Sequence, residues 1–157
     1  MQIKQLSVFL ENRQGRLSAP CAALADAGIN ILTLTLADTE RFGILRLIVR
    51  DVEKAKSVLE RCGFVVKLTE VLAIEVEDRP GGLGNLLSTL ETARVNIEYM
   101  YAFTAHNAGK AVMIFRFSDT AKAIDSLAAA GIPVLKAADL YERSGGLNSA
   151  ASKIDQR

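Results

Sequence analysis

The chain has 157 residues, of which 50% are hydrophobic and 24% are charged, and its formal net charge is +1. This composition suits a soluble protein of one or two globular domains and gives no electrostatic reason to expect nucleic acid or an anionic membrane as a partner. No apolar run approaches the roughly 20 residues that span a bilayer, and the N-terminus lacks a signal-peptide core. We therefore expect a cytoplasmic protein.

The residues that commonly carry catalysis or metal binding are sparse. Cys21 and Cys62 are too few for a disulfide scaffold, so we interpret them as reduced core thiols, with a disulfide or redox pair as the open alternative. One His and two separated Cys give no metal-ligand cluster, and no nucleotide-binding glycine motif is present. Without a nucleophile–base pair or paired carboxylates, the sequence predicts neither an enzyme nor a cofactor.

The predicted elements begin with a strand in which Leu6, Val8 and Leu10 alternate toward one face. A helix follows, with Leu17, Cys21 and Leu24 on one stripe, Pro20 in its first turn and Gly28 at its exit. Two β-branched segments, 29–38 and 42–50, predict a hairpin. Asp51 then caps a second helix, 52–62, which Gly63 ends before a fourth strand, 64–68.

The same series occurs a second time. An offset of 66 aligns Leu6–Ile31 with Leu72–Ile97, and the offset becomes 68 after the hairpin, where Asp51 and Gly63 align with Asp119 and Gly131. Identical residues recur at turns and core positions in a constant order, which indicates a tandem duplication. We predict one domain at 1–69, a second at 70–142, and a disordered tail at 143–157.

A strand–helix–strand–strand–helix–strand order predicts a four-stranded antiparallel sheet with both helices on one face, the ferredoxin-like arrangement of an α+β protein. The other face of each sheet is also apolar, with Phe9, Ile44 and Ile48 in the first copy. An apolar open face usually needs a partner surface, so we expect the copies, or two chains, to pair.

The most informative feature is the loop between the first strand and the first helix of each copy, "ENRQGRL" and "EDRPGGL". Backbone N–H groups at a helix N-terminus can hold a carboxylate or phosphate, and glycines permit close approach. The plain alternative is that the glycines only make the turn. Arg13 and Arg79 recur in both loops, either as anion ligands or as solvent-exposed charges.

These loops, followed by "GINI" or "RVNI", resemble the ACT domain family of small βαββαβ regulatory modules that bind amino acids. The resemblance covers both repeats and implies tandem domains paired side by side, with an effector amino acid at the domain interface and a homodimer as the assembly. It implies that loop amides hold the ligand carboxylate, that Asn12 and Asp78 lie at the polar side, and that Asn30 and Asn96 complete the partner side. Gln14 stands where the family usually has Pro and Arg16 adds bulk, so the second copy matches the pattern better. The implied ligand-binding residues are Asn12, Arg13, Gln14, Gly15, Arg16, Leu17, Asn30, Ile31, Asp78, Arg79, Pro80, Gly81, Gly82, Leu83, Asn96 and Ile97.

The leading hypothesis is a non-catalytic allosteric regulator that senses an amino acid, alone or with a metabolic enzyme as partner. The alternative is a structural adaptor or regulatory subunit with vestigial pockets. RNA binding shares the βαββαβ order but requires aromatic residues on the open sheet face, whereas Phe115 and Phe117 are in phase with core positions.

Overall fold

The computed structural model describes residues 2–38, 42–107 and 109–142, and the tail predicted to be disordered, 143–157, lies outside them. The chain forms two compact units. One contains Lys4–Glu70, and the other contains the described residues from Val71 onward together with Gln2 and Ile3. The repeat boundaries drawn from the sequence, 1–69 and 70–142, remain our proposal for the two domains.

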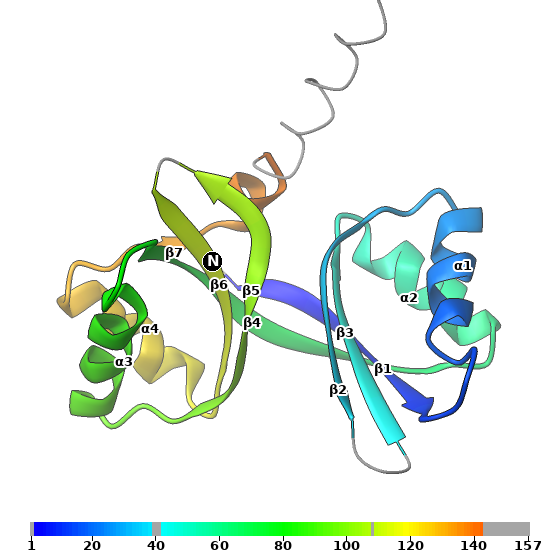
Figure 1. Ribbon diagram of the computed structural model, residues 1–157, viewed down its shortest axis with the longest axis horizontal. Helices are drawn as coiled ribbons and strands as arrows, with labels where there is room; N and C mark the ends of the chain where they lie inside the picture. Colours follow the sequence, from blue (N-terminus) through cyan, green and yellow to red (C-terminus); the bar gives the residue numbers. More distant parts are fainter. Residues whose placement is uncertain (1, 39–41, 108, 143–157) are drawn as a thin grey trace, which may run out of the picture. The chain divides into compact units, whose positions relative to one another are not determined.

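The first unit follows the element order of the first repeat (Figure 1). Its elements are β1 (Ile3–Glu11), α1 (Ser18–Asp26), β2 (Ile31–Asp38), β3 (Phe42–Val49), α2 (Val52–Arg61) and β4 (Val65–Glu77). Strand β3 pairs antiparallel with both β1 and β2, and β4 lies beside β1 in the strand order. The two helices lie together on one face of this sheet.

The second unit repeats the arrangement. β4 leads into α3 (Gly82–Thr92), β5 (Ile97–Asn107), β6 (Lys110–Phe117), α4 (Thr120–Ala129) and β7 (Val134–Leu135). Strand β6 pairs antiparallel with β4 and β5, and β7 pairs with the other edge of β4. The predicted α+β fold of two tandem ferredoxin-like units is confirmed.

Each unit has its own hydrophobic core between the sheet and the helices. In the first unit, alternate residues of β1 pack with Leu24 and Leu59 of the two helices. In the second, alternate residues of β4 pack with Leu90 and the rings of Phe115 and Phe117, whose centroids are 5.6 Å apart. Those two aromatic residues therefore face the helices, as their phase in β6 predicts, and not the open face of the sheet.

The turns that join these elements follow the predicted chemistry. The carboxylate of Asp51 accepts a hydrogen bond from the Lys54 N–H at 3.1 Å, and that of Asp119 accepts one from the Lys122 N–H at 2.9 Å. Both aspartates therefore cap the second helix of their unit. Gly63 leaves its helix with a left-handed backbone, as Gly131 does in the second copy.

Three features of the strands and helices differ from expectation. The fourth strand of the first repeat and the first strand of the second are one continuous strand, β4, because no Gly or Pro interrupts residues 65–77. The last strand, β7, has only two residues, since Pro133 supplies no N–H before it. The chain then forms a short helical segment at 137–142, in which the Asp139 carboxylate accepts a hydrogen bond from the Lys136 N–H at 3.3 Å.

The predicted stripe of Leu17, Cys21 and Leu24 is only partly correct. Helix α1 begins at Ser18, so Leu17 precedes it and is 42% exposed, whereas Pro20 and Leu24 are the buried residues. The interpretation of both cysteines as core thiols is wrong, because Cys62 ends α2 at the surface and is exposed, while Cys21 is half-buried. Both thiols are free.

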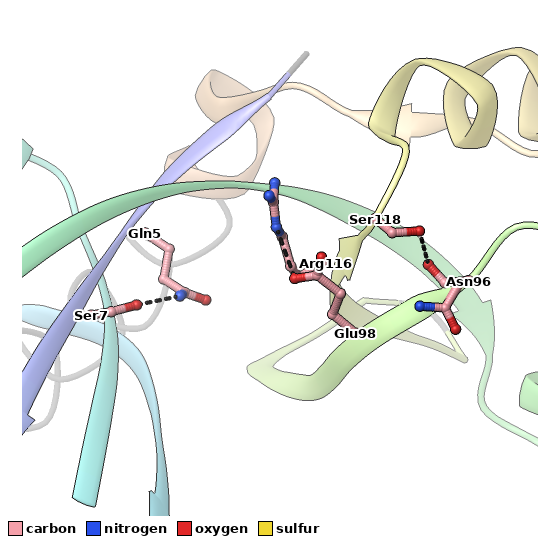
Figure 2. Close-up of polar contacts among 6 residues, drawn as sticks. All are labelled: Gln5, Ser7, Asn96, Glu98, Arg116 and Ser118. Carbon is pink, nitrogen blue, oxygen red and sulfur yellow. Dashed lines mark hydrogen bonds and ion pairs between the residues drawn. The ribbon is translucent and has the colours of Figure 1, made fainter.

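The sheet face away from the helices carries buried polar side chains that the sequence did not single out. On β1, the Gln5 amide donates to the Ser7 hydroxyl at 3.1 Å, and both side chains are buried (Figure 2). On the corresponding face of the second unit, Arg116 pairs with Glu98 at 3.3 Å. Among the residues that the structure describes, no helix is long and apolar enough to cross a membrane.

Candidate functional site

The two strand–helix loops have the same turn at their start. The Arg13 N–H donates to the Glu11 carbonyl at 2.9 Å, and the Arg79 N–H donates to the Glu77 carbonyl at the same distance. The glycine two residues later is left-handed in both loops, with φ of +82° at Gly15 and +87° at Gly81. These are backbone conformations that favour glycine, so the duplicated Gly has a structural reason that does not depend on a ligand.

The two loops differ in conformation from the next residue onward. In the second copy, α3 begins at Gly82, so close to the end of β4 that a Cβ on Gly82 would lie 2.1 Å from the Glu77 carbonyl oxygen. The aligned residue of the first copy is Arg16, which carries a Cβ. There the helix begins at Ser18, two aligned positions later. The second loop alone therefore brings a helix N-terminus directly against the end of the preceding strand.

The loop arginines are directed onto the glutamates at the strand ends. The Arg79 guanidinium donates to the Glu77 carboxylate at 2.6 Å. In the first copy, Arg16 lies 3.2 Å and Arg13 lies 3.6 Å from the Glu11 carboxylate. All of these side chains are largely exposed, so the ion pairs contribute little stability. Their effect is to hold the arginine side chains beside the ends of the strands.

The two asparagines predicted for the partner side lie far from the loop of their own unit. In the first sheet, Glu11 pairs with Phe42 at the loop end, whereas Ile31 pairs with Val49 at the other end. The second sheet repeats this, with Ile97 pairing with Phe117. Asn30 and Asn96, which precede these isoleucines, are exposed, while Ile31 and Ile97 are half-buried against the cores.

The surroundings of Asn96 show which of its groups are engaged. Its main-chain carbonyl accepts hydrogen bonds from the Ser118 N–H at 3.2 Å and from the Ser118 hydroxyl at 3.5 Å. Figure 2 shows the side-chain amide of Asn96 extending away from Ser118. The structure thus brings together the residues of each loop, and it does not join Asn30 or Asn96 to the loop of the same unit.

A hollow of about 350 Å³ opens beside the second loop. Asp78, Arg79, Pro80 and Leu83 line it from the loop, and its remaining walls are Val76, Glu77, Ala111 and Met113. This volume is within the range of about 300–1,000 Å³ that is usual for small-molecule sites. The loop N–H of Asp78 donates to the Gly109 carbonyl at 2.9 Å, which ties the loop to the β5–β6 hairpin that forms the floor.

A second hollow, of about 390 Å³, lies on the other side of the same loop, between α3 and the turn before β7. Two of its charged groups are already paired across its rim, Arg79 with Glu77 and Lys110 with Glu75. A hollow of about 690 Å³ occupies the equivalent place in the first unit and includes Arg16 and Cys62 in its lining. Fewer of the predicted loop residues line these two hollows, so the 350 Å³ hollow fits the predicted site better.

The walls Ala111 and Met113 are functional candidates that the sequence interpretation missed. They lie on β6, where Ala111 pairs with Val76 and Met113 pairs with Ile74. Their signal was available in the hairpin register, because residues opposite the last few positions of β4 must lie near the loop that follows it. In the part of the chain that the structure describes, no group of three or more His, Cys, Asp or Glu side chains is placed to hold a metal ion.

Residues 1–142 match the family described as the ACT domain pair. The chain belongs to this family. A protein from Bacteroides thetaiotaomicron with a solved crystal structure is 41% identical, with a TM-score of 0.83, and the match covers 90% of this chain and 96% of that one. No curated protein sequence matches the chain.

More distant structures share the fold of the ACT domain pair. The ligand-free regulatory subunit of aspartate kinase from Thermus thermophilus is 16% identical, with a TM-score of 0.60, and the match covers 82% of this chain and 90% of that one. The corresponding subunit from Thermus flavus is 15% identical, with a TM-score of 0.56, and the match covers 81% and 91% of the two chains. At these identities the likeness shows the fold alone.

Proposed function

We propose that this ACT domain pair is a non-catalytic regulatory protein that binds an amino acid effector at its strand–helix loops. The observation that carries the proposal is the second loop, whose residues Asp78, Arg79 and Pro80, with Leu83 in the first turn of α3, line a 350 Å³ hollow. Membership of the family supports the same proposal. The recurrence of loop residues in both copies of the chain supports it as well.

The chemistry of the second loop suits the carboxylate of an amino acid. The first N–H groups of a helix have no partner within the helix, and the helix dipole favours a negative charge at that end. The residue before α3 is Gly81, which provides no side chain to cap these groups. The Gly82 N–H already donates to the Arg79 carbonyl, so a ligand carboxylate bound there would be stabilised by the N–H groups that follow it in the first turn, while Asp78 at the rim would accept from its ammonium group.

The exposed asparagines support a dimeric site. β2 and β5 are the outermost strands of their units in the strand order, so an edge strand can pair with the same strand of a second chain. In an antiparallel pair, the start of one strand lies beside the end of the other. Asn30 or Asn96 would then lie near the partner's loop, which it cannot reach in its own unit. We therefore propose a homodimer whose pockets are completed across the interface.

A regulatory role requires that ligand binding be coupled to a change in the pairing of the chains. A ligand shifts an equilibrium only between states that it binds unequally, and a site completed by a second chain binds better in the paired state. The solved structures of similar fold include regulatory subunits of aspartate kinase, and by analogy we propose an enzyme of amino acid metabolism as the regulated partner. The alternative is a structural adaptor whose pockets are vestigial and bind no effector.

The test is a thermal-shift screen of the purified protein against all the common amino acids, with calorimetry on each hit. A ligand present at 100 times its Kd adds about 2.7 kcal/mol to the stability of the folded state, which is visible as a higher Tm. A selective hit supports the effector role, and a mass measurement with and without that ligand tests the homodimer. The absence of any hit at millimolar concentration would favour the adaptor.

A further inference from the structure

The hollow beside the second loop has an apolar floor that remains accessible. Leu83, Ala111 and Met113 are each half-buried, and with Pro80 they form the apolar lining of this hollow outside β4. An apolar group placed against them would remove further apolar surface from water, which is favourable at roughly 25 cal/mol per Å². A charged or strongly polar group placed there would lose hydration without gaining a partner.

In the first unit, the equivalent space is occupied by the chain itself. Gly43 aligns with Ala111, and a Cβ placed on Gly43 would lie 3.3 Å from the Leu36 Cδ1 atom. The side chain of Leu36 therefore lies over the position where the second unit has its hollow. The residue of the second unit that aligns with Leu36 is Ala102, which pairs with Met113 in the β5–β6 hairpin. A shorter side chain on the edge strand leaves this space open.

The charge at the polar side of the loop also differs between the two units. Asp78 lines the hollow, is exposed, and within the described residues has no hydrogen bond or ion pair to its carboxylate. The aligned residue in the first loop is the neutral Asn12. An ammonium group at the rim of the second hollow would gain a charge-assisted hydrogen bond to Asp78 that Asn12 cannot offer at full strength.

We propose that only the second loop is an effector site, and that it takes one α-amino acid with an apolar side chain per chain. The side chain lies on Leu83, Ala111 and Met113, the ammonium group is held by Asp78, and Leu36 covers the corresponding position beside Gly43 in the first copy. This inference rests on the proposed function, because it specifies the ligand class and the stoichiometry of the same site.

The first experiment is isothermal titration of the full-length protein with a panel of amino acids. The panel contains leucine, isoleucine, valine, methionine and phenylalanine as apolar members, and serine, aspartate and lysine as polar members. The expected result is selective binding of one or more apolar members, with one ligand per chain. A polar member as the tightest ligand, or two ligands per chain, overturns the inference while leaving the proposed function in place.

Two pairs of variants locate the site, and in each pair the first copy supplies the control. Ala102→Leu places in the second hollow the side chain that Leu36 places in the first, and is expected to abolish measurable binding. Asp78→Asn is expected to weaken binding about tenfold or more, through loss of a charge-assisted hydrogen bond. Leu36→Ala and Asn12→Asp make the reciprocal changes in the first loop and are expected to leave the affinity for the apolar ligand unchanged.

These variants allow a loss of ligand binding to be distinguished from a failure to fold. Asp78 is exposed and its substitution is nearly isosteric, so Asp78→Asn remains informative if Ala102→Leu lowers the Tm. Unchanged binding by Asp78→Asn together with weakened binding by Asn12→Asp would move the site to the first loop and overturn the inference. Failure of every amino acid to bind the unaltered protein would overturn both the inference and the proposed function.

Discussion

Gly82 lies against the carbonyl oxygen of Glu77, and the Gly82 N–H donates to the Arg79 carbonyl at 3.0 Å. This contact fixes the start of α3 against the end of β4 with no room for a side chain. A larger residue at Gly82 must shift backbone atoms and not only a flexible side chain. Any loss of ligand binding in a Gly82 variant would therefore report on the shape of the loop as well as on access to it.

The first prediction concerns this contact. Gly82→Ala is expected to lower the free energy of unfolding by about 1–3 kcal/mol, since the added Cβ overpacks against backbone. Gly84→Ala, two residues along the same helix, is the matched control, because a Cβ there meets nothing within 4 Å. It is expected to stabilise α3 by up to about 1 kcal/mol. Urea unfolding of both variants measures the difference, and equal effects would contradict the close contact.

A second prediction uses the exits of the first helices. Arg94 has a left-handed backbone with φ of +53°, at the place where the first copy has Gly28 with φ of +69°. A residue with a Cβ is strained there by about 1–2 kcal/mol, whereas glycine is not. Arg94→Gly is therefore expected to raise the free energy of unfolding by about 1 kcal/mol, and Gly28→Ala to lower it by a similar amount.

The reciprocal design controls for side-chain contacts. The Lys122 ammonium donates to the main-chain carbonyl of Arg94 at 3.2 Å, as Lys54 donates to the Ala27 carbonyl at 2.9 Å. Both bonds go to main-chain oxygens and are retained in the variants. Thermal melts of the two single variants and of the double variant are the measurement, and destabilisation by Arg94→Gly would show that the strain is absent.

A third prediction tests the second-helix caps. Removing the cap with Asp51→Ala or Asp119→Ala is expected to cost about 1 kcal/mol in each case, because an N–H group of the first turn loses its acceptor. Asp→Asn at either position retains an acceptor and is expected to cost less. Asp125→Ala is the control in α4, since Asp125 is exposed in the helix interior and alanine is the better helix former there. Chemical denaturation distinguishes these outcomes.

A fourth prediction concerns the helical segment at 137–142. Leu140 is fully buried, with no exposed area, although it lies beyond the last strand. Leu140→Ala is expected to lower the free energy of unfolding by about 2–5 kcal/mol, as for other buried leucines. Glu142→Ala, which changes an exposed residue in the same segment, is expected to have little effect. A cost below that range for Leu140→Ala would mean that the segment does not pack on its unit.

Much of the fold followed from local patterns. The offset of 66 and then 68 between the copies, the alternation of Leu6, Val8 and Leu10, and the caps at Asp51 and Asp119 were sufficient for the element order and the faces of the strands. These signals depend on neighbours a few residues away, and because the sequence is duplicated each of them occurs in both copies. The existence of the two strand–helix loops, with a glycine at the aligned positions 15 and 81, also follows from that pattern.

The sequence by itself therefore determined a tandem pair of βαββαβ units and the two candidate loops. Only the tertiary structure decided where each element begins and what lies beside it: that Leu17 precedes its helix, that residues 65–77 are one strand, and that Leu36 lies beside Gly43 while a hollow opens beside the second loop. The physical reason is that these facts depend on contacts between residues far apart in the chain. Steric fit across neighbouring strands, and not local propensity, determines which side chain lies beside each of the two loops.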